Sequence, residues 1–128
     1  MMLDKNATIL IVDDTLIMRE SLRRILLAMG YEHVMQATNG REAIKVLETP
    51  GNNIDLMFLD IVMPIMDGKA ALKKIRETNK TLPAIMLTSV ADKDSIIECS
   101  KQGITGYVLK PINATDGPAM LTDIFATL

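Results

Sequence analysis

A chain of 128 residues, 48% hydrophobic and 23% charged, is long enough for one domain with a substantial core but not for two. The formal net charge of -2 and the 3% aromatic content argue against direct nucleic-acid binding, and no apolar run approaches the ~20 residues that cross a bilayer. With one cysteine, Cys99, the chain has no internal disulfide, which suits a reducing compartment, so we expect a cytoplasmic protein without membrane insertion.

Short apolar runs alternate with amphipathic segments five times along the chain. Apolar runs bounded by turn formers are typical of strands buried on both faces, and apolar residues three and four apart indicate helices. In chain order we expect strands at 8–12, 33–37, 54–59, 83–88 and 105–110, followed respectively by helices at 16–29, 41–47, 69–78, 93–102 and 118–127. Because every connection is long enough for a parallel crossover, the sequence predicts an α/β fold, a doubly wound (βα)5 sheet forming a single domain over residues 1–128.

Polar side chains follow or end four of these strands. Asp13 and Asp14 follow the first strand, Asp60 the third, Thr88 ends the fourth and Lys110 the fifth. Because the carboxyl ends of parallel strands share one edge of the sheet, we expect these groups to meet there. Clustered carboxylates raise a pKa or require a cation, and hard oxygen ligands with room for water suit Mg²⁺. The lysine and the hydroxyl suit a phosphoryl group, and a carboxylate in this setting can become an aspartyl phosphate.

Each of these residues also has a plainer interpretation. Asp60 can cap the loop that follows it, and Asp13-Asp14 can form a solvated turn. Ser89 also carries a hydroxyl, and because side chains alternate along a strand, only one of Thr88 and Ser89 points at the site. Asp67-Gly68 is more typical of a turn and helix start than of a ligand.

Three further positions have ordinary structural interpretations. Cys99 is typical of a small buried residue on a helix, and His33 of an edge residue rather than of a phosphorelay histidine. Asp116-Gly117-Pro118 predicts a late start and a shortened last helix, because proline is comfortable at the first helical position.

In this set of residues the chain resembles the receiver domains of bacterial two-component response regulators, over nearly its whole length. The resemblance rests on Asp13-Asp14, Leu59-Asp60, Met63-Pro64, Asp67-Gly68, Thr88 and Lys110-Pro111. It implies a flavodoxin-like sheet with strand order 2-1-3-4-5. It also implies a cis peptide bond between Lys110 and Pro111.

The resemblance implies a role for each site residue. Asp60 would be the phosphoacceptor. Mg²⁺ would be bound directly by Asp14 and Asp60, through water by Asp13, and by the backbone carbonyl of Val62.

Three further roles follow from the same resemblance. Lys110 would pair with the phosphoryl group. Thr88 would move toward it, and Tyr107 would turn inward as the second switch residue. Because Val62 and Val90, each two residues after a site residue, are both apolar, we hypothesise slow self-dephosphorylation, with a phosphoprotein lifetime well beyond seconds.

The implied function is a phosphorylation-activated signalling switch rather than an enzyme, with chemistry limited to its own phosphorylation and dephosphorylation. A histidine kinase or a histidine phosphotransfer protein would donate the phosphoryl group, and binding to an unknown downstream protein would carry the signal. The sequence leaves the donor, the target, the pathway and the oligomeric state open.

Three alternatives compete with this interpretation. A haloacid-dehalogenase-type phosphoaspartyl hydrolase needs a second aspartate two residues after the nucleophile, where this chain has Val62. A flavodoxin-like cofactor-binding module needs hydroxyls and amides in its first loop, where Asp13-Asp14 would repel a phosphate. The third alternative is a receiver fragment of a DNA-binding regulator, which a longer reading frame would reveal.

Overall fold

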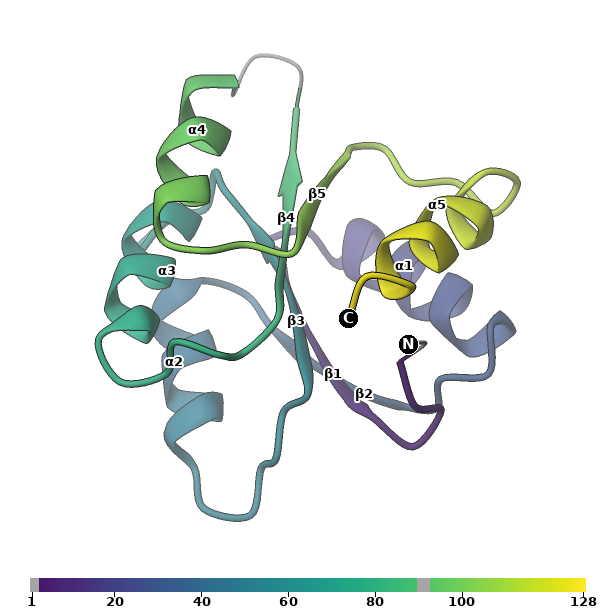
Figure 1. The fold of residues 1–128 in the computed structure, drawn as a ribbon, viewed down its shortest axis with the longest axis horizontal. Coiled ribbons are helices and arrows are strands. Elements are labelled where there is room, and N and C mark those ends of the chain that lie inside the picture. Colours follow the sequence, from purple (N-terminus) through teal and green to yellow (C-terminus); the bar gives the residue numbers. More distant parts are fainter. Residues whose placement is uncertain (1–2, 90–92) are drawn as a thin grey trace.

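A five-stranded parallel sheet with helices on both faces makes up the structure, a computed structural model that describes residues 3–89 and 93–128 (Figure 1). The strands are β1 (Thr8–Val12), β2 (His33–Ala37), β3 (Leu56–Asp60), β4 (Ala84–Thr88) and β5 (Gly106–Leu109), and the helices are α1 (Leu16–Ala28), α2 (Gly40–Glu48), α3 (Gly68–Arg76), α4 (Lys93–Lys101) and α5 (Gly117–Phe125). The strand order is β2-β1-β3-β4-β5. The predicted α/β fold and strand order are confirmed.

The central strands divide their side chains between two cores. In β1, Ile9 and Ile11 face one core and Leu10 and Val12 the other, and all four side chains are fully buried. This burial on both faces explains why the strands appear in the sequence as continuous apolar runs without polar alternation.

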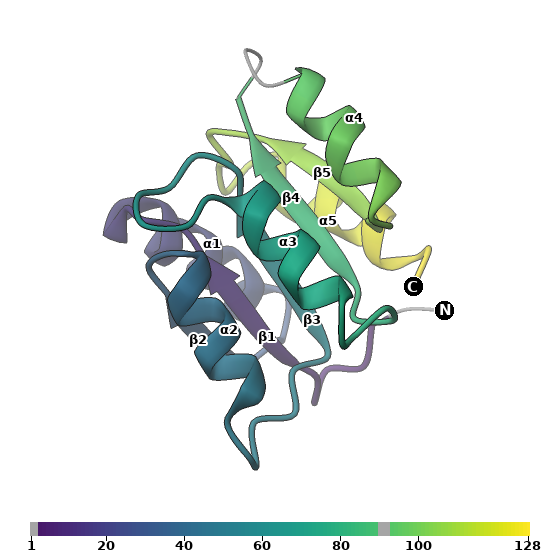
Figure 2. The same ribbon diagram turned by 90° about the vertical axis from the view of Figure 1, so that its left-hand side faces the viewer.

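The helices complete these cores in two layers. α1 and α5 cover one face, where Tyr31 and Phe125 meet edge to face with their ring centroids 5.4 Å apart. α2, α3 and α4 lie side by side across the other face (Figure 2). Each helix therefore buries part of its surface against the sheet, whereas apolar side chains such as Ile17 of α1 and Ile97 of α4 remain exposed.

The start of α3 is fixed close to the end of β3. The Asp67 side chain accepts a hydrogen bond from the Ala70 amide at 2.8 Å, which confirms the predicted helix start at Asp67-Gly68. Gly68 packs against the backbone carbonyl of Asp60 so closely that any β-carbon would overlap it. A side chain at position 68 would therefore displace either α3 or Asp60.

The predicted strands and helices are confirmed, and none of their ends differs from the prediction by more than two residues. Cys99 is buried and His33 is exposed on the edge strand β2. α5 begins only at Gly117, with Pro118 in its first turn, so the late start that Asp116-Gly117-Pro118 predicts is confirmed. Within the described part of the chain, none of the helices has the length and apolar character needed to span a bilayer.

Candidate functional site

Three carboxylates meet at the carboxyl edge of the sheet. Asp13 and Asp14 follow β1, and Asp60 is the last residue of β3. The two strands are neighbours in a register that pairs Val12 with Leu59, so Asp13 comes to lie beside Asp60. One oxygen from each of the three carboxylates lies within 4.8 Å of the other two. The structure thus brings together the acids that the sequence analysis singled out.

Lys110 reaches the same point from the end of β5. Its Nζ lies 3.0 Å from Oδ2 of Asp13 and 3.2 Å from Oδ2 of Asp60. Its amide donates to the carbonyl of Thr88 at 2.8 Å, which holds the residue against β4. The peptide bond from Lys110 to Pro111 is cis, as the resemblance implied. A single ammonium therefore bridges two buried carboxylates.

Asp13 is held by residues that the sequence analysis did not connect with the site. Its Oδ1 accepts from the amide of Thr15 at 2.9 Å and from the Thr15 hydroxyl at 3.0 Å. Its backbone carbonyl accepts from Nη1 of Arg19 at 2.8 Å, and Nε of Arg19 donates to Gln36 Oε1 at 2.9 Å. Arg19 belongs to α1, and only the fold shows that this part of the helix borders the acids.

Burial and like charge change the proton affinity of the site. Burial and the negative charge of Asp13 raise the pKa of Asp60 to about 6, against the opposing effect of Lys110. For Lys110, burial alone would lower the pKa, but its contacts with Asp13 and Asp60 outweigh burial and raise the pKa above its ordinary value. The ammonium thus stays charged, while the cluster retains excess negative charge that a bound cation would neutralise.

The donor set fits a small divalent cation. Asp60 and Asp13 are buried, with 4% and 0% of their surface exposed, whereas Asp14 is exposed at the mouth of the site. Carboxylate oxygens with access to solvent are the ligands that Mg²⁺ prefers, because it keeps several waters and uses one or two carboxylates. The acidic cluster can therefore hold such a metal ion.

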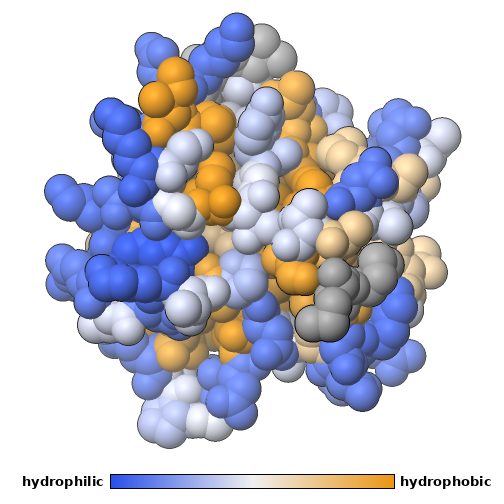
Figure 3. Space-filling view, viewed as in Figure 1, coloured by the Kyte–Doolittle hydropathy of each residue, from blue (hydrophilic) through white to orange (hydrophobic). Residues whose placement is uncertain are grey.

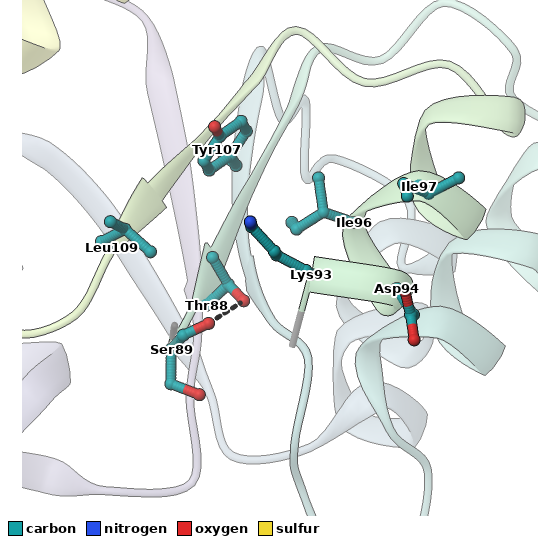
Figure 4. A pocket seen from close by; sticks show the side chains of 8 residues that line it. All are labelled: Thr88, Ser89, Lys93, Asp94, Ile96, Ile97, Tyr107 and Leu109. Atoms are coloured by element: carbon teal, nitrogen blue, oxygen red, sulfur yellow. Dashed lines mark hydrogen bonds between the residues drawn. The ribbon is translucent and has the colours of Figure 1, made fainter. Parts of the chain in front are cut away.

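Thr88 and Tyr107 line a hollow between β4, β5 and α4. The Thr88 side chain is buried, and its hydroxyl donates to the Ser89 carbonyl at 3.1 Å. Tyr107 is 53% exposed, and its ring lies across the hollow from Ile96, with Lys93 reaching between them (Figure 4). The hollow encloses about 440 Å³. The structure thus has space beside β5 next to the threonine predicted to move.

The hypothesis of slow self-dephosphorylation rests on Val62 and Val90, of which the structure describes only Val62. Val62 lies in the loop after β3, two residues beyond Asp60, with its side chain 65% exposed. Val90 lies outside the described residues. The lifetime of the phosphorylated form stays a prediction.

Comparison with known proteins identifies the family. The family model for the response regulator receiver domain matches residues 9–122. Chemotaxis protein CheY-3 of Vibrio cholerae is 37% identical over 128 residues, which cover 98% of this chain and 97% of that protein. The yeast osmosensing histidine protein kinase SLN1 is 36% identical over 130 residues, which cover 96% of this chain but only 11% of the kinase.

A solved structure gives the same result for the fold. The CheX–CheY–BeF3–Mg complex of Borrelia burgdorferi superposes with a TM-score of 0.83 at 28% identity, over 93% of this chain and 89% of that chain. The family match excludes both the haloacid-dehalogenase-type hydrolase and the flavodoxin-like cofactor-binding module as the family of this chain. The chain belongs to the response regulator receiver domain family and is a receiver domain of the CheY type, a phosphoacceptor switch of two-component signalling.

Proposed function

We propose that Asp60 is the residue that accepts the phosphoryl group. The observation that carries the proposal is the convergence of three segments on one carboxylate: Asp60 ends β3, Lys110 Nζ lies 3.2 Å from its Oδ2, and Asp13 and Asp14 present oxygens within 4.8 Å. Phosphotransfer depends mainly on positioning and charge neutralisation, and this arrangement suits both.

The transfer forms one bond and breaks one. A carboxylate oxygen of Asp60 attacks the phosphorus of a phosphohistidine, the O–P bond forms, and the P–N bond breaks. The bonding electrons stay with the imidazole nitrogen, which takes up a proton, and the product is an acyl phosphate on Asp60. Lys110, already paired with Oδ2, lies where it can compensate the negative charge of the incoming phosphoryl oxygens.

Mg²⁺ is the proposed cofactor. Asp14 and Asp60 would bind it directly, Asp13 through water, and the backbone carbonyl of Val62 would complete the protein ligands. When bound, the ion supplies positive charge to the phosphoryl oxygens. In this chain Asp13 keeps its hydrogen bonds to Thr15 and its ion pair with Lys110, which suits an outer role better than direct coordination.

The signal would pass from the phosphoryl group to the surface through Thr88 and Tyr107. The Thr88 hydroxyl would exchange its hydrogen bond to the neighbouring Ser89 carbonyl, at 3.1 Å, for one to a phosphoryl oxygen. Its movement would leave space that the exposed ring of Tyr107 can enter from the hollow beside β5. A phosphoryl dianion would in this way bias a two-state element and change the surface over α4 and β5.

The proposed donor is a histidine kinase or a histidine phosphotransfer protein, and the proposed output is binding to a downstream protein. Four large apolar side chains on the loops and helix beside the acids are more than half exposed, namely Leu16, Ile17, Val62 and Ile65. They offer a contact surface to any protein that brings a phosphohistidine to Asp60. We further propose that residues 1–128 act as a single cytoplasmic receiver domain whose own chemistry is limited to gaining and losing the phosphoryl group.

Incubation with acetyl phosphate and Mg²⁺, followed by intact mass measurement, tests the proposal. The wild type should gain the mass of one phosphoryl group, and Asp60→Asn should gain none. Asp55→Asn is the matched control, because Asp55 lies just before β3 at the opposite end of the strand, and it should gain the same mass as the wild type. A gain that persists in Asp60→Asn assigns the phosphoacceptor elsewhere.

A further inference from the structure

The peptide unit between Asp13 and Asp14 is held by a residue from outside the acid cluster. Nη1 of Arg19 donates to the backbone carbonyl of Asp13 at 2.8 Å, and Nε of the same guanidinium donates to Gln36 Oε1 at 2.9 Å. On its other side, the amide of Asp13 donates to the carbonyl of Ala37 at 3.1 Å. Strand β2, which supplies no acid to the site, thus fixes the backbone of Asp13 both directly and through Arg19.

This peptide unit decides whether both acids can face one point. Successive side chains of an extended strand point to opposite sides of the sheet. Asp13 and Asp14 are consecutive, yet each brings an oxygen within 4.8 Å of the other and of Asp60. The chain must therefore turn between them, and the direction of the Asp13 carbonyl sets how far Asp14 is rotated.

The two acids differ in how they are supported. Both carboxylate oxygens of Asp13 are occupied, Oδ1 by Thr15 and Oδ2 by Lys110. The Asp14 side chain is exposed, and within residues 3–89 and 93–128 its carboxylate makes no hydrogen bond or ion pair. The position of Asp14 therefore depends on its backbone, and through the backbone on Arg19.

We propose that Arg19, oriented by Gln36, is a positioning residue that aims Asp14 at the cation site. The inference rests on the proposed function, because it assumes that Asp14 and Asp60 bind Mg²⁺. Supporting contacts around a metal site commonly change metal affinity by roughly 10- to 100-fold when they are removed. The same guanidinium is also a positive charge beside a cation site, and by charge alone its removal would strengthen Mg²⁺ binding.

The direction in which the Kd for Mg²⁺ changes therefore distinguishes a positioning role of Arg19 from an effect of its charge. Titration calorimetry with MgCl2 on the unphosphorylated protein measures it. Arg19→Met should raise the Kd for Mg²⁺ by about tenfold, although it removes a repelling charge. Arg19→Lys keeps the charge but cannot donate to Gln36 and to the Asp13 carbonyl in the same geometry, so it should raise the Kd as well. Gln36→Leu leaves net charge unchanged and should raise the Kd by about threefold, because the guanidinium keeps one of its two contacts.

The controls separate positioning from a general loss of structure. Arg24→Met makes the same charge change at an exposed residue of the same helix and should leave the Kd at the wild-type value or slightly lower. Urea unfolding in EDTA measures stability without the ion. Phosphorylation by acetyl phosphate at rising MgCl2 should reach the wild-type maximum rate in Gln36→Leu, with only the half-saturating concentration increased.

Each outcome decides the matter. Weaker Mg²⁺ binding in all three variants, with an unchanged maximum rate in Gln36→Leu, supports the positioning role. An unchanged or lower Kd in Arg19→Met and Gln36→Leu overturns it while leaving the proposed function intact. Failure of the wild type itself to bind Mg²⁺ in an Asp60-dependent way overturns both.

Discussion

At the scale of single residues, Asp60 combines burial with a neighbouring negative charge. Burial and Asp13 raise its pKa to about 6, and the ion pair with Lys110 at 3.2 Å offsets only part of this effect. A carboxyl group that holds its proton more tightly in the folded protein than in the unfolded chain stabilises the fold at low pH and loses that contribution as pH rises. The site therefore costs stability in the absence of a cation.

This cost predicts a pH-dependent difference between the wild type and Asp60→Asn. Below pH ~3 the Asp60 carboxyl is protonated in both the folded and the unfolded protein, and the wild type and Asp60→Asn should differ little in stability. As pH rises from the ordinary carboxyl pKa of 3.8 to the folded value of about 6, the free energy of unfolding of the wild type should fall relative to that of Asp60→Asn. At pH 7.5 in EDTA, Asp60→Asn should be more stable by about 3 kcal/mol in urea unfolding, because each unit of the pKa shift corresponds to ~1.4 kcal/mol. Greater stability of the wild type than of Asp60→Asn at pH 7.5 would contradict the raised pKa of Asp60.

A second single-residue feature lies in the loop after β3. Ile65 has φ of 68°, the one non-glycine residue with positive φ among those described, and its side chain is 75% exposed. The Met66 amide donates to the Pro64 carbonyl at 2.7 Å, so Ile65 occupies the centre of a tight three-residue turn. A β-branched residue in this conformation is strained, and its exposed side chain recovers little energy by packing.

Relief of this strain should stabilise the protein. Ile65→Asn should raise the free energy of unfolding by about 1 kcal/mol, because asparagine tolerates the left-handed conformation. Val62→Asn is the matched control, since Val62 is an exposed apolar residue of the same loop with ordinary backbone angles, and it should be neutral or slightly destabilising. Equal effects of the two substitutions in urea unfolding would exclude backbone strain as the cause.

At the scale of elements, one side chain ties the C-terminal ends of α3 and α4 to the start of β4. The guanidinium of Arg76, 7% exposed, donates to the backbone carbonyls of Asn79 at 3.0 Å and Leu82 at 2.7 Å. It also donates to those of Gln102 at 3.2 Å and Gly103 at 2.8 Å. Burial lowers the pKa of Arg76, and the backbone carbonyls, including two just after the C-terminal end of α4, compensate its charge in place of a carboxylate.

Removal of the Arg76 guanidinium should lower the stability of the protein, because four backbone carbonyl groups would lose this hydrogen-bond donor. Arg76→Met should lower the free energy of unfolding by about 3 kcal/mol while keeping the aliphatic part of the side chain. Arg41→Met, at an exposed arginine of α2, should change it by less than about 0.5 kcal/mol. Thermal or urea unfolding followed by circular dichroism measures both. A loss at Arg76 no larger than at Arg41 would show that the four contacts contribute little.

At the scale of the whole molecule, the acids and the surface over α4 and β5 lie on either side of β4. Apolar side chains interrupt the hydrophilic surface in that region (Figure 3), and Ile97, Tyr107 and Leu109 are each about half exposed. Thr88 stands at the end of β4 between the two regions. If Thr88 moves toward the phosphoryl group as proposed, a shift of this one strand end would connect phosphorylation with a change of surface.

The two tyrosines make that change measurable. The chain has no tryptophan, Tyr31 is fully buried, and Tyr107 is 53% exposed, so acrylamide quenching of tyrosine fluorescence reports on Tyr107. With acetyl phosphate and Mg²⁺, quenching should fall toward the level of Tyr107→Phe, in which only Tyr31 remains. In Thr88→Ala, quenching should stay at the unphosphorylated level. Unchanged quenching in the fully phosphorylated wild type would contradict the inward movement of Tyr107.

The sequence by itself determined the elements and the acids, because local chemistry is sufficient for both. Buried strands need continuous apolar runs, and the residues that end them, Asp13, Asp14, Asp60 and Lys110, could be named from their positions alone. The order of the strands came from family resemblance, because the pairing of parallel strands depends on crossover geometry that no local pattern encodes. Several ends of elements differ from the prediction by one or two residues, since helix and strand termini depend on packing partners.

Only the tertiary structure decided which ordinary residues support the site. Arg19 and Arg24 belong to the same polar face in the sequence, but only Arg19 lies within reach of the Asp13 carbonyl, because β2 brings Gln36 beside it. Arg76 likewise resembles a surface charge until α4 and β4 surround it. These roles depend on contacts between segments distant in sequence. A local pattern can therefore identify the acids and the lysine that gather at the candidate site, but not the residues that hold them in place.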